Sequence, residues 1–168
     1  GLVVASQWAQ RYTAWCSVGG TGFSDWHHTA LDSNRALGVW QNSTEMPSTV
    51  RRGALSAYNG YLDYTVGDTP ATFNTSVLSA RIKADGSLGA WNVLTSFSVG
   101  RRWHVSVVNN GYLYIMGGYA DSGFPLNTPI YYSDVQVTKL KADGTLTSPN
   151  LSGCSGAVWC ATSSCTTG

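Results

Sequence analysis

Internal repetition is the feature that most limits how this sequence can fold. The segment Ala57–Leu62 returns 51 residues later as Val108–Leu113, and both contain an Asn-Gly step followed by Tyr-Leu. Leu37–Trp40 returns at the same distance as Leu88–Trp91. A third element recurs with spacings of 48 and 50 residues, at Val18-Gly19-Gly20, Val66-Gly67-Asp68 and Met116-Gly117-Gly118. The chain of 168 residues is therefore organised as three similar units with a period near 50.

Each unit has the pattern of short antiparallel strands. Asn-Gly readily takes the φ > 0 conformations of a two-residue hairpin turn, and aromatic and β-branched residues flank it. Four strands are expected per unit, and the first hairpin should be longer because residues 7–10 replace the Asn-Gly turn. The expected ranges are 2–6, 11–18, 26–31 and 37–41, then 53–58, 61–66, 76–82 and 88–92, then 104–108, 112–116, 134–140 and 146–148. The connection 118–133, with Pro125 and Pro129, is expected to be a long functional loop.

A period near 50 with four strands per repeat is typical of β-propeller blades. The sequence predicts an all-β fold of three four-stranded antiparallel blades, at about 1–41, 51–92 and 101–148, followed by a Cys/Ser/Gly-rich tail at 149–168. Propellers usually close with four to eight blades. Three blades therefore predict a piece of a longer propeller, a ring closed by association of copies, or an arc whose ends the tail covers.

Charge and cysteine content narrow the class of protein. Ten Lys and Arg face nine Asp and Glu, and no basic run is present, so nothing indicates nucleic-acid binding. No apolar run approaches the 18 residues of a membrane span. Three of the four cysteines fall in the last 15 residues, which favours an oxidising compartment. The sequence thus predicts a secreted or surface-exposed protein.

The repeat resembles the kelch motif, in a form like that of bacterial secreted proteins. The resemblance lies in Arg-Arg before an inner strand, Asn-Gly-Tyr-Leu-Tyr, a glycine pair and Asp-Gly-Ser-Leu-Gly-Ala-Trp. The third unit matches best, at Arg101, Arg102, Gly111, Tyr112, Gly117 and Gly118. The second departs with Asp68 for a glycine, the third lacks the closing Trp, and the first lacks the arginines and the Asn-Gly turn. The resemblance implies four-stranded propeller blades and covers nearly the whole chain apart from the tail.

The candidate binding residues precede the inner strands, where the binding face of a propeller often lies. They are Arg51, Arg52, Arg101, Arg102, Trp103 and His104. An Arg fork could reach a carboxylate while Trp103 stacks on a ring, giving an anion- or sugar-binding rim. The alternative is structural: the arginines bond carbonyls of a neighbouring blade and His104 is a satisfied strand residue. We expect no metal and no cofactor, since Trp26-His27-His28 offers no third ligand nearby.

The acids and cysteines leave alternatives open. Asp63 is the one acid in an unusual place, between Leu62 and Tyr64 in an expected strand, where it faces either solvent or a neighbouring arginine. A hydrolase would need a second carboxylate nearby. The cysteines Cys16, Cys154, Cys160 and Cys165 are disulfide candidates that allow three full pairings. Either Cys154 with Cys165 or Cys160 with Cys16 would tie the tail down.

The function favoured by these features is non-catalytic. An extracellular binding, adhesion or assembly module is expected, with a glycan or protein as partner, because aromatic and polar loop residues outnumber charges. One alternative is a structural subunit that self-associates through blade edges into a ring or filament. The other is a fragment of a glycan-active hydrolase or oxidase.

Overall fold

The protein is built from antiparallel β-sheets. The structure, a computed structural model, describes residues 3–8, 11–16, 24–34, 36–69, 72–121, 128–151, 154 and 156–162, with the backbone alone for 3–8, 11–16 and 162. Those residues form fifteen strands and no helix, which confirms the all-β prediction. In these ranges no helix is therefore long and apolar enough to cross a membrane.

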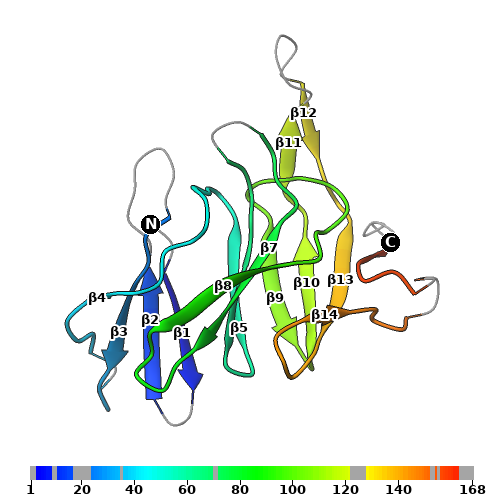
Figure 1. The fold of residues 1–168 in the computed structure, drawn as a ribbon. Helices are drawn as coiled ribbons and strands as arrows, with labels where there is room; N and C mark the ends of the chain where they lie inside the picture. The colour runs from blue at the N-terminus through cyan, green and yellow to red at the C-terminus, as the bar shows by residue number, and fades with distance from the viewer. Residues whose placement is uncertain are drawn as a thin grey trace.

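Three sheets follow one another along the chain (Figure 1). Sheet I contains β1 (Val3–Trp8), β2 (Arg11–Cys16), β3 (His27–Leu31) and β4 (Gln41–Asn42). Sheet II contains β5 (Ala54–Tyr58), β6 (Tyr61–Thr65), β7 (Val77–Ile82) and β8 (Leu88–Leu94). Sheet III contains β9 (Val105–Asn109), β10 (Tyr112–Met116) and β13 (Val135–Leu140), with both β14 (Leu146–Thr147) and β15 (Cys160–Thr162) paired to β13. Strand order follows chain order in sheets I and II, as successive hairpins require.

The Asn-Gly turns fix the register of sheets II and III. Asn59 and Gly60 have φ of 46° and 82°, and Asn110 and Gly111 have φ of 50° and 79°. These are the left-handed values of a two-residue hairpin turn. Tyr58 consequently pairs with Tyr61, and every later pair in that hairpin follows.

Three expectations about connections are wrong. The first hairpin is no longer than the others, because β1 ends at Trp8 and β2 begins at its partner Arg11. The fourth strand of sheet I covers only Gln41–Asn42, while Leu37 makes a single bridge to Leu31. The connection after β10 contains a two-stranded ribbon, β11 (Tyr119–Asp121) and β12 (Pro129–Tyr131). The turn residues alone did not indicate these pairings, because they depend on neighbouring strands.

The arginines of the second and third units correspond in a different register from the one that residue identity suggests. The sequence aligns Arg51-Arg52 with Arg101-Arg102, a shift of 50. Backbone bridges instead join Arg51 to Asp68 and Arg102 to Tyr119, which is a shift of 51 on both sides. Arg102 therefore corresponds to Arg51, and Trp103 corresponds to Arg52. Both Arg52 and Trp103 have left-handed backbones, with φ of 55° and 56°.

The tail completes sheet III, although its residues belong to no repeat. In sheet II, Leu88 pairs with Ile82 and Trp91 pairs with Ala80. In sheet III, Leu146 pairs with Leu140, and Cys160, the residue after Trp159, pairs with Val137. Thirteen positions separate Leu146 from Trp159, against three between Leu88 and Trp91. A ten-residue insertion thus splits the fourth strand into β14 and β15.

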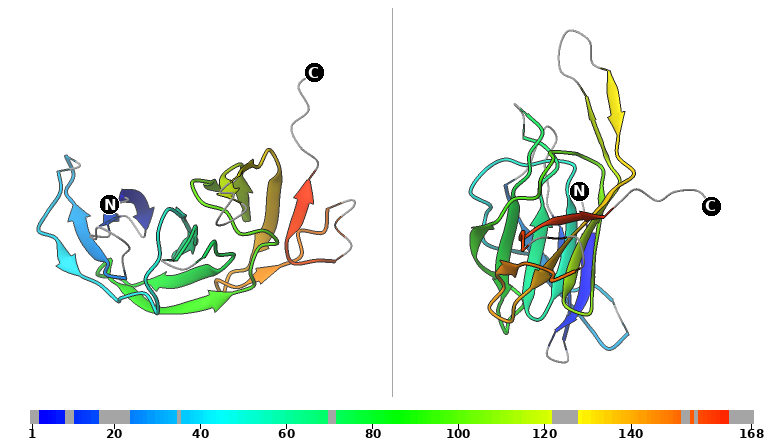
Figure 2. Two further views of the ribbon diagram at one scale, coloured as in Figure 1. Left: turned by 90° about the horizontal axis from the view of Figure 1, so that it is seen from above. Right: turned by 90° about the vertical axis from the view of Figure 1, so that its right-hand side faces the viewer.

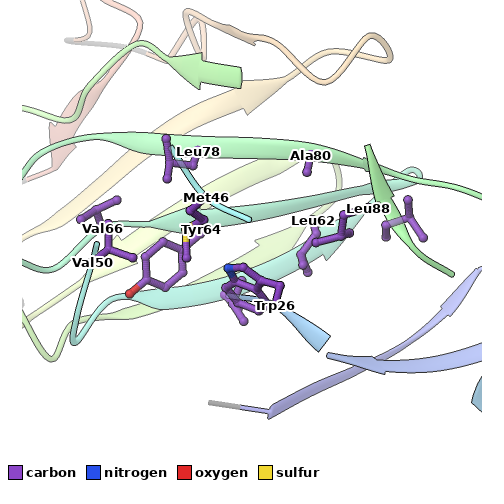
Figure 3. Close-up of a cluster of buried hydrophobic side chains, with 11 residues drawn as sticks. Trp26, Met46, Val50, Leu62, Tyr64, Val66, Leu78, Ala80 and Leu88 are labelled. Atoms are coloured by element: carbon purple, nitrogen blue, oxygen red, sulfur yellow. The ribbon is translucent and has the colours of Figure 1, made fainter. Parts of the chain in front are cut away.

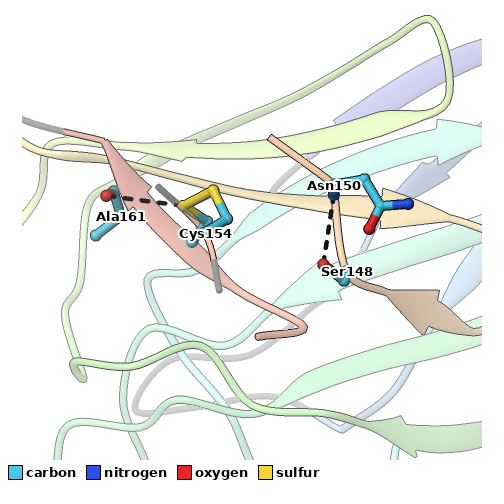
Figure 4. The surroundings of a disulfide bond; sticks show 5 residues. Ser148, Asn150, Cys154 and Ala161 are labelled. Carbon is cyan, nitrogen blue, oxygen red and sulfur yellow. Dashed lines mark hydrogen bonds between the residues drawn. A yellow bond between two sulfur atoms is a disulfide. The ribbon is translucent and has the colours of Figure 1, made fainter. Parts of the chain in front are cut away.

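A disulfide closes this insertion (Figure 4). Cys154 bonds to Cys160 across six positions, so the pairings Cys154–Cys165 and Cys160–Cys16 are wrong. Cys165 and the side chain of Cys16 lie outside the described residues. The bridge packs on Val137 of β13, beside Tyr112 and Tyr114 of β10. It therefore anchors the tail to the face of sheet III that points away from sheet II.

The three sheets form an open arc, with their first strands on its concave side (Figure 2). A core lies at each junction between sheets. Between sheets I and II, Trp26 packs edge-on against Tyr64 with ring centroids 6.1 Å apart, among residues such as Met46, Leu62 and Leu88 (Figure 3). Between sheets II and III, Phe97, Leu113 and Leu146 occupy the positions of Met46, Leu62 and Leu88, and Trp159 joins them. The two cores are therefore built at equivalent positions, shifted by one repeat.

Candidate functional site

The candidate site lies at the end of sheets II and III where the strands β5 and β9 begin. Here the backbone of Arg102 pairs with that of Tyr119 by two hydrogen bonds of 2.9 Å, which ties the ribbon to the start of β9. The amide of Trp103 donates to the carbonyl oxygen of Arg52 at 2.9 Å. These bonds bring the strand starts and the ribbon, well separated in the chain, to one end of the molecule.

Three aromatic side chains form a continuous surface that we call the aromatic platform: Trp103, Tyr119 and Tyr131. Trp103 stacks on Tyr119 with ring centroids 5.5 Å apart and planes at 25°. Tyr131 lies 5.6 Å from Tyr119 on the other side. Trp103 is 61% exposed and Tyr131 is 77% exposed. Large aromatic faces left open to water are uncommon and mark surfaces where ligands bind.

The guanidinium of Arg102 supports the platform from below. Its central carbon lies 4.7 Å from the ring centroid of Trp103, 4.8 Å from that of Tyr119 and 4.9 Å from that of Phe73. Arg52 adds a second cation 5.5 Å from the Trp103 ring. Cations over aromatic faces are attracted by the ring quadrupole, most strongly for Trp. The rings of Trp103, Tyr119 and Phe73 therefore surround one guanidinium group.

One carboxylate gathers the arginines. Asp68 accepts from Arg52 at 2.7 Å and lies 3.4 Å from Arg51 and 3.5 Å from Arg102. Asp121 of the ribbon lies 3.4 Å from the other side of the Arg102 guanidinium. Asp68 follows Gly67, at the position where the other two units have the second glycine of a pair. This departure from the repeat places a carboxylate among the arginines.

Two sequence-predicted site residues are structural. Arg101 is 0% exposed, bonds the carbonyl oxygen of Gly117 at 3.0 Å and both oxygens of Asp134, and covers the Tyr132 ring at 4.1 Å. Its guanidinium holds the pKa of Asp134 below the usual range. Arg101 is therefore unavailable to a ligand, which corrects the expectation of a binding role.

His104 is the second correction. It is buried, and its Nε2 lies 2.8 Å from the hydroxyl oxygen of Thr65. Burial, together with the charge of Arg101, lowers the pKa of His104 to about 4. The imidazole is consequently neutral at physiological pH and joins sheets II and III.

Of the six predicted residues, the structure brings Arg51, Arg52, Arg102 and Trp103 together at the platform. Sequence reasoning missed Tyr119, Tyr131, Phe73, Asp68 and Asp121. Asp68 carried a signal, because it interrupts the glycine pair, but its role depends on arginines 16 to 34 positions away. The tyrosines lie on the ribbon inside the connection 118–133, which was expected to be a long functional loop.

Other candidates from the sequence lie elsewhere. Asp63 is buried between sheets II and III and faces neither solvent nor an arginine; burial raises its pKa to about 6. His27 lies 3.3 Å from Asp25, while His28 lines a cleft of about 160 Å³ beside Asp85. Within the described ranges, no three His, Cys, Asp or Glu side chains come together as metal ligands would.

Comparison with known proteins identifies the fold alone. No protein-family model matches the sequence, and no curated protein matches it. Solved structures do match, among them YjhT, with a TM-score of 0.53 and 12% sequence identity over 82% of this chain. The aligned part is 52% of that structure, so the chain spans about half of its length. At this identity the likeness concerns the backbone arrangement and not the platform residues.

Proposed function

We propose that sheets I, II and III are blades of a kelch-type β-propeller. Support comes from the three successive antiparallel sheets, the two equivalent cores between them and the first strands on the concave side of the arc. The period near 50 and the motif around Arg102, Gly111 and Gly118 agree with this fold. The protein acts outside the cytosol, where the Cys154–Cys160 disulfide persists.

The function is non-catalytic glycan binding on the aromatic platform. The observation that carries this proposal is that Trp103 and Tyr131, both mostly exposed, pack against Tyr119, with Arg102 over the Trp103 ring. Flat aromatic faces pack against the apolar face of a sugar ring, and guanidinium groups donate to hydroxyl or carboxylate oxygens. The platform lies at the end of a sheet, where ligand contacts need little reordering.

A protein ligand is the alternative, because Trp, Tyr and Arg also dominate the hot spots of protein interfaces. The glycan is favoured because the Trp103 and Tyr131 rings are mostly exposed to water. A protein hot spot typically lies inside a well-packed, desolvated pocket.

Affinity electrophoresis tests the proposal. The purified chain runs through gels containing a neutral β-glucan, a mannan or a polygalacturonate. At least one polysaccharide should retard it, and Trp103→Ala or Tyr131→Ala should weaken retardation roughly tenfold, the equivalent of one lost stacking contact. Tyr58→Ala is the matched control, since Tyr58 is also an exposed aromatic residue but ends β5 at the opposite end of the sheet.

Either of two results would contradict glycan binding on the platform. Unchanged migration in every gel would remove the glycan and direct attention to a protein ligand. Retardation that Trp103→Ala leaves intact, while Tyr58→Ala abolishes it, would place the site at the other end of the sheets.

A further inference from the structure

The two junctions within the arc share one rule of contact. At the junction of sheets I and II, Leu88 is buried, and the indole nitrogen of Trp91 donates to the carbonyl oxygen of Thr44 at 2.9 Å. Trp91 also packs on Trp26 at 5.6 Å. The fourth strand of a sheet thus presents a Leu and a Trp to the segment that leaves the preceding sheet.

The junction of sheets II and III repeats this contact. Leu146 is buried, and the indole nitrogen of Trp159 donates to the carbonyl oxygen of Thr95 at 2.9 Å. Thr95 follows Thr44 by 51 residues. The rule holds even though an insertion separates Leu146 from Trp159, so the contact is a property of the junction and not of local sequence.

Sheet I carries the same residues, and here they are exposed. Leu37 and Trp40 correspond to Leu88 and Trp91, and they are 55% and 36% exposed. Val39 between them is exposed as well. We call Leu37, Val39 and Trp40 the sheet I flank. It is the half of a junction that receives the exit segment and outward face of a preceding sheet.

Sheet III presents the other half. Val105 and Val107 of β9 share one face with Tyr114 and Met116 of β10, as their pairing requires. Val105 is 59% exposed, and Val107 is also exposed. The disulfide-bonded segment covers this face over Val137 but leaves β9 open. We call Val105 and Val107 the sheet III flank.

The matching face of sheet II shows that such a surface is a docking face. There the equivalents of Val105 and Val107 are Ala54 and Ser56, and Ser56 meets Ser106 of sheet III through hydroxyl oxygens 2.8 Å apart. Sheet III bears valines at these positions and directs them to water. Adjacent β-branched apolar residues on an open sheet face mark an interface.

We propose that a second copy of this chain fills both flanks, with the sheet III flank of each copy docking on the sheet I flank of the other. Both flanks are exposed in the structure, so a head-to-tail pairing of two copies covers both at once. Such heterologous interfaces close into a ring when the rotation per step allows it. Two arcs of three sheets make six units, within the four to eight at which propellers close.

The second copy is favoured over an unrelated partner because the complementary surface is already present in the sequence. The contact is between faces of sheets, so it requires no strand addition at an edge.

Sedimentation equilibrium with variants of each flank tests the pairing. The wild-type chain should be a dimer in the micromolar range. Val107→Asp on one flank and Trp40→Ala on the other should each weaken dimerisation, the aspartate by roughly a hundredfold or more because its carboxylate would be buried without a partner. Val93→Asp is the control, since Val93 is similarly exposed but lies on β8 of sheet II, away from both flanks.

Mixing the two variants is the sharper measurement. Each variant alone lacks one half of every interface, whereas the mixture can form one intact interface from the sheet I flank of one and the sheet III flank of the other. The mixture should therefore regain dimer. A monomeric wild-type chain would overturn the proposal, as would dimerisation that survives both variants or open polymers in place of a dimer. Circular dichroism of each variant shows whether it is folded.

Discussion

Asp63 is a carboxylate buried at the interface between sheets II and III. Its replacement by a neutral residue should stabilise the protein, and the gain should depend on pH. The side chain is buried on β6, with Ser56 and Ser79 paired beside it across the sheet. Burial raises the pKa of Asp63 from 3.8 to about 6, an effect that the Ser79 hydroxyl offsets only in part. The ionised form is therefore disfavoured in the native state.

The sign and size of the effect follow from proton linkage. Between pH 3.8 and about 6 the native chain binds a proton at Asp63 that the unfolded chain has released, so the free energy of unfolding falls as pH rises through this window. A shift of about two pKa units corresponds to about 3 kcal/mol. Asp63→Asn keeps the shape without the charge. Its stability relative to wild type should therefore grow by about 3 kcal/mol from pH 4 to pH 7.

Because His104 also titrates in this window, the stability of Asp63→Asn must be compared with that of wild type at each pH. Its native pKa of about 4 lies below the ordinary 6.5, so the unfolded chain binds its proton first and stability falls as pH drops through the same window. The two groups oppose each other, and burial also lowers the pKa of His28, so the wild-type profile alone does not isolate Asp63. Subtracting wild type from Asp63→Asn cancels His104 and leaves Asp63.

Urea unfolding followed by tryptophan fluorescence, from about pH 3.5 to about pH 7.5, measures this difference. Asp143→Asn is the control. The Thr145 hydroxyl and amide lower the pKa of Asp143 in its exposed turn, so Asp143 is protonated only below the tested range, and this variant should keep a nearly constant difference from wild type above about pH 4.5. A constant difference between Asp63→Asn and wild type across the range would refute the burial argument.

Other substitutions separate the core from the platform. Trp159→Ala should lower the free energy of unfolding by about 3–5 kcal/mol, because it empties the junction core, as denaturant titration would show. Gly67→Ala should cost about 3 kcal/mol or more, since a Cβ there lies 2.3 Å from the carbonyl oxygen of Arg52, whereas Gly156→Ala, with open space around it, should cost only about 1 kcal/mol for its positive φ. Trp103→Ala should change stability by less than about 1 kcal/mol and leave the melting temperature nearly unchanged, because the ring is mostly exposed. A large loss of stability in that variant would show that Trp103 contributes to the core.

Local signals predicted most of the fold. Asn59-Gly60 and Asn110-Gly111 fix hairpins because a left-handed turn restricts the register within a few residues. The strands that flank them were predicted to within about one or two residues. Contacts that depend on distant partners were not predictable in this way. Trp159 is the closing tryptophan that the third repeat seemed to lack, and it packs between sheets II and III. It was not recognised because ten inserted residues separate it from Leu146.

The site was predictable in its location but not in its composition. The sequence marks the starts of β5 and β9, and four of the six candidate side chains do lie together there. Arg101 and Arg102 look equivalent in sequence, yet the bridge to Tyr119 gives Arg102 the position of Arg51 and buries its neighbour. A one-residue change of register moves a side chain to the opposite face of a strand. Residue identity cannot reveal that change.

Arg102 connects these conclusions, because it is the residue on which the platform rests. It faces Asp68 and Asp121 and touches the rings of Trp103 and Tyr119. Arg102→Ala should cost about 2 kcal/mol, since both carboxylates lose a partner in a mostly buried setting. Arg102→Lys restores the charge but not the planar group that stacks on the rings. The lysine variant should therefore regain most of the stability while the near-ultraviolet circular dichroism of Trp103 stays weakened and polysaccharide binding stays lost. If Arg102→Lys has the wild-type spectrum and binding, charge alone orders the platform and the stacking argument is wrong.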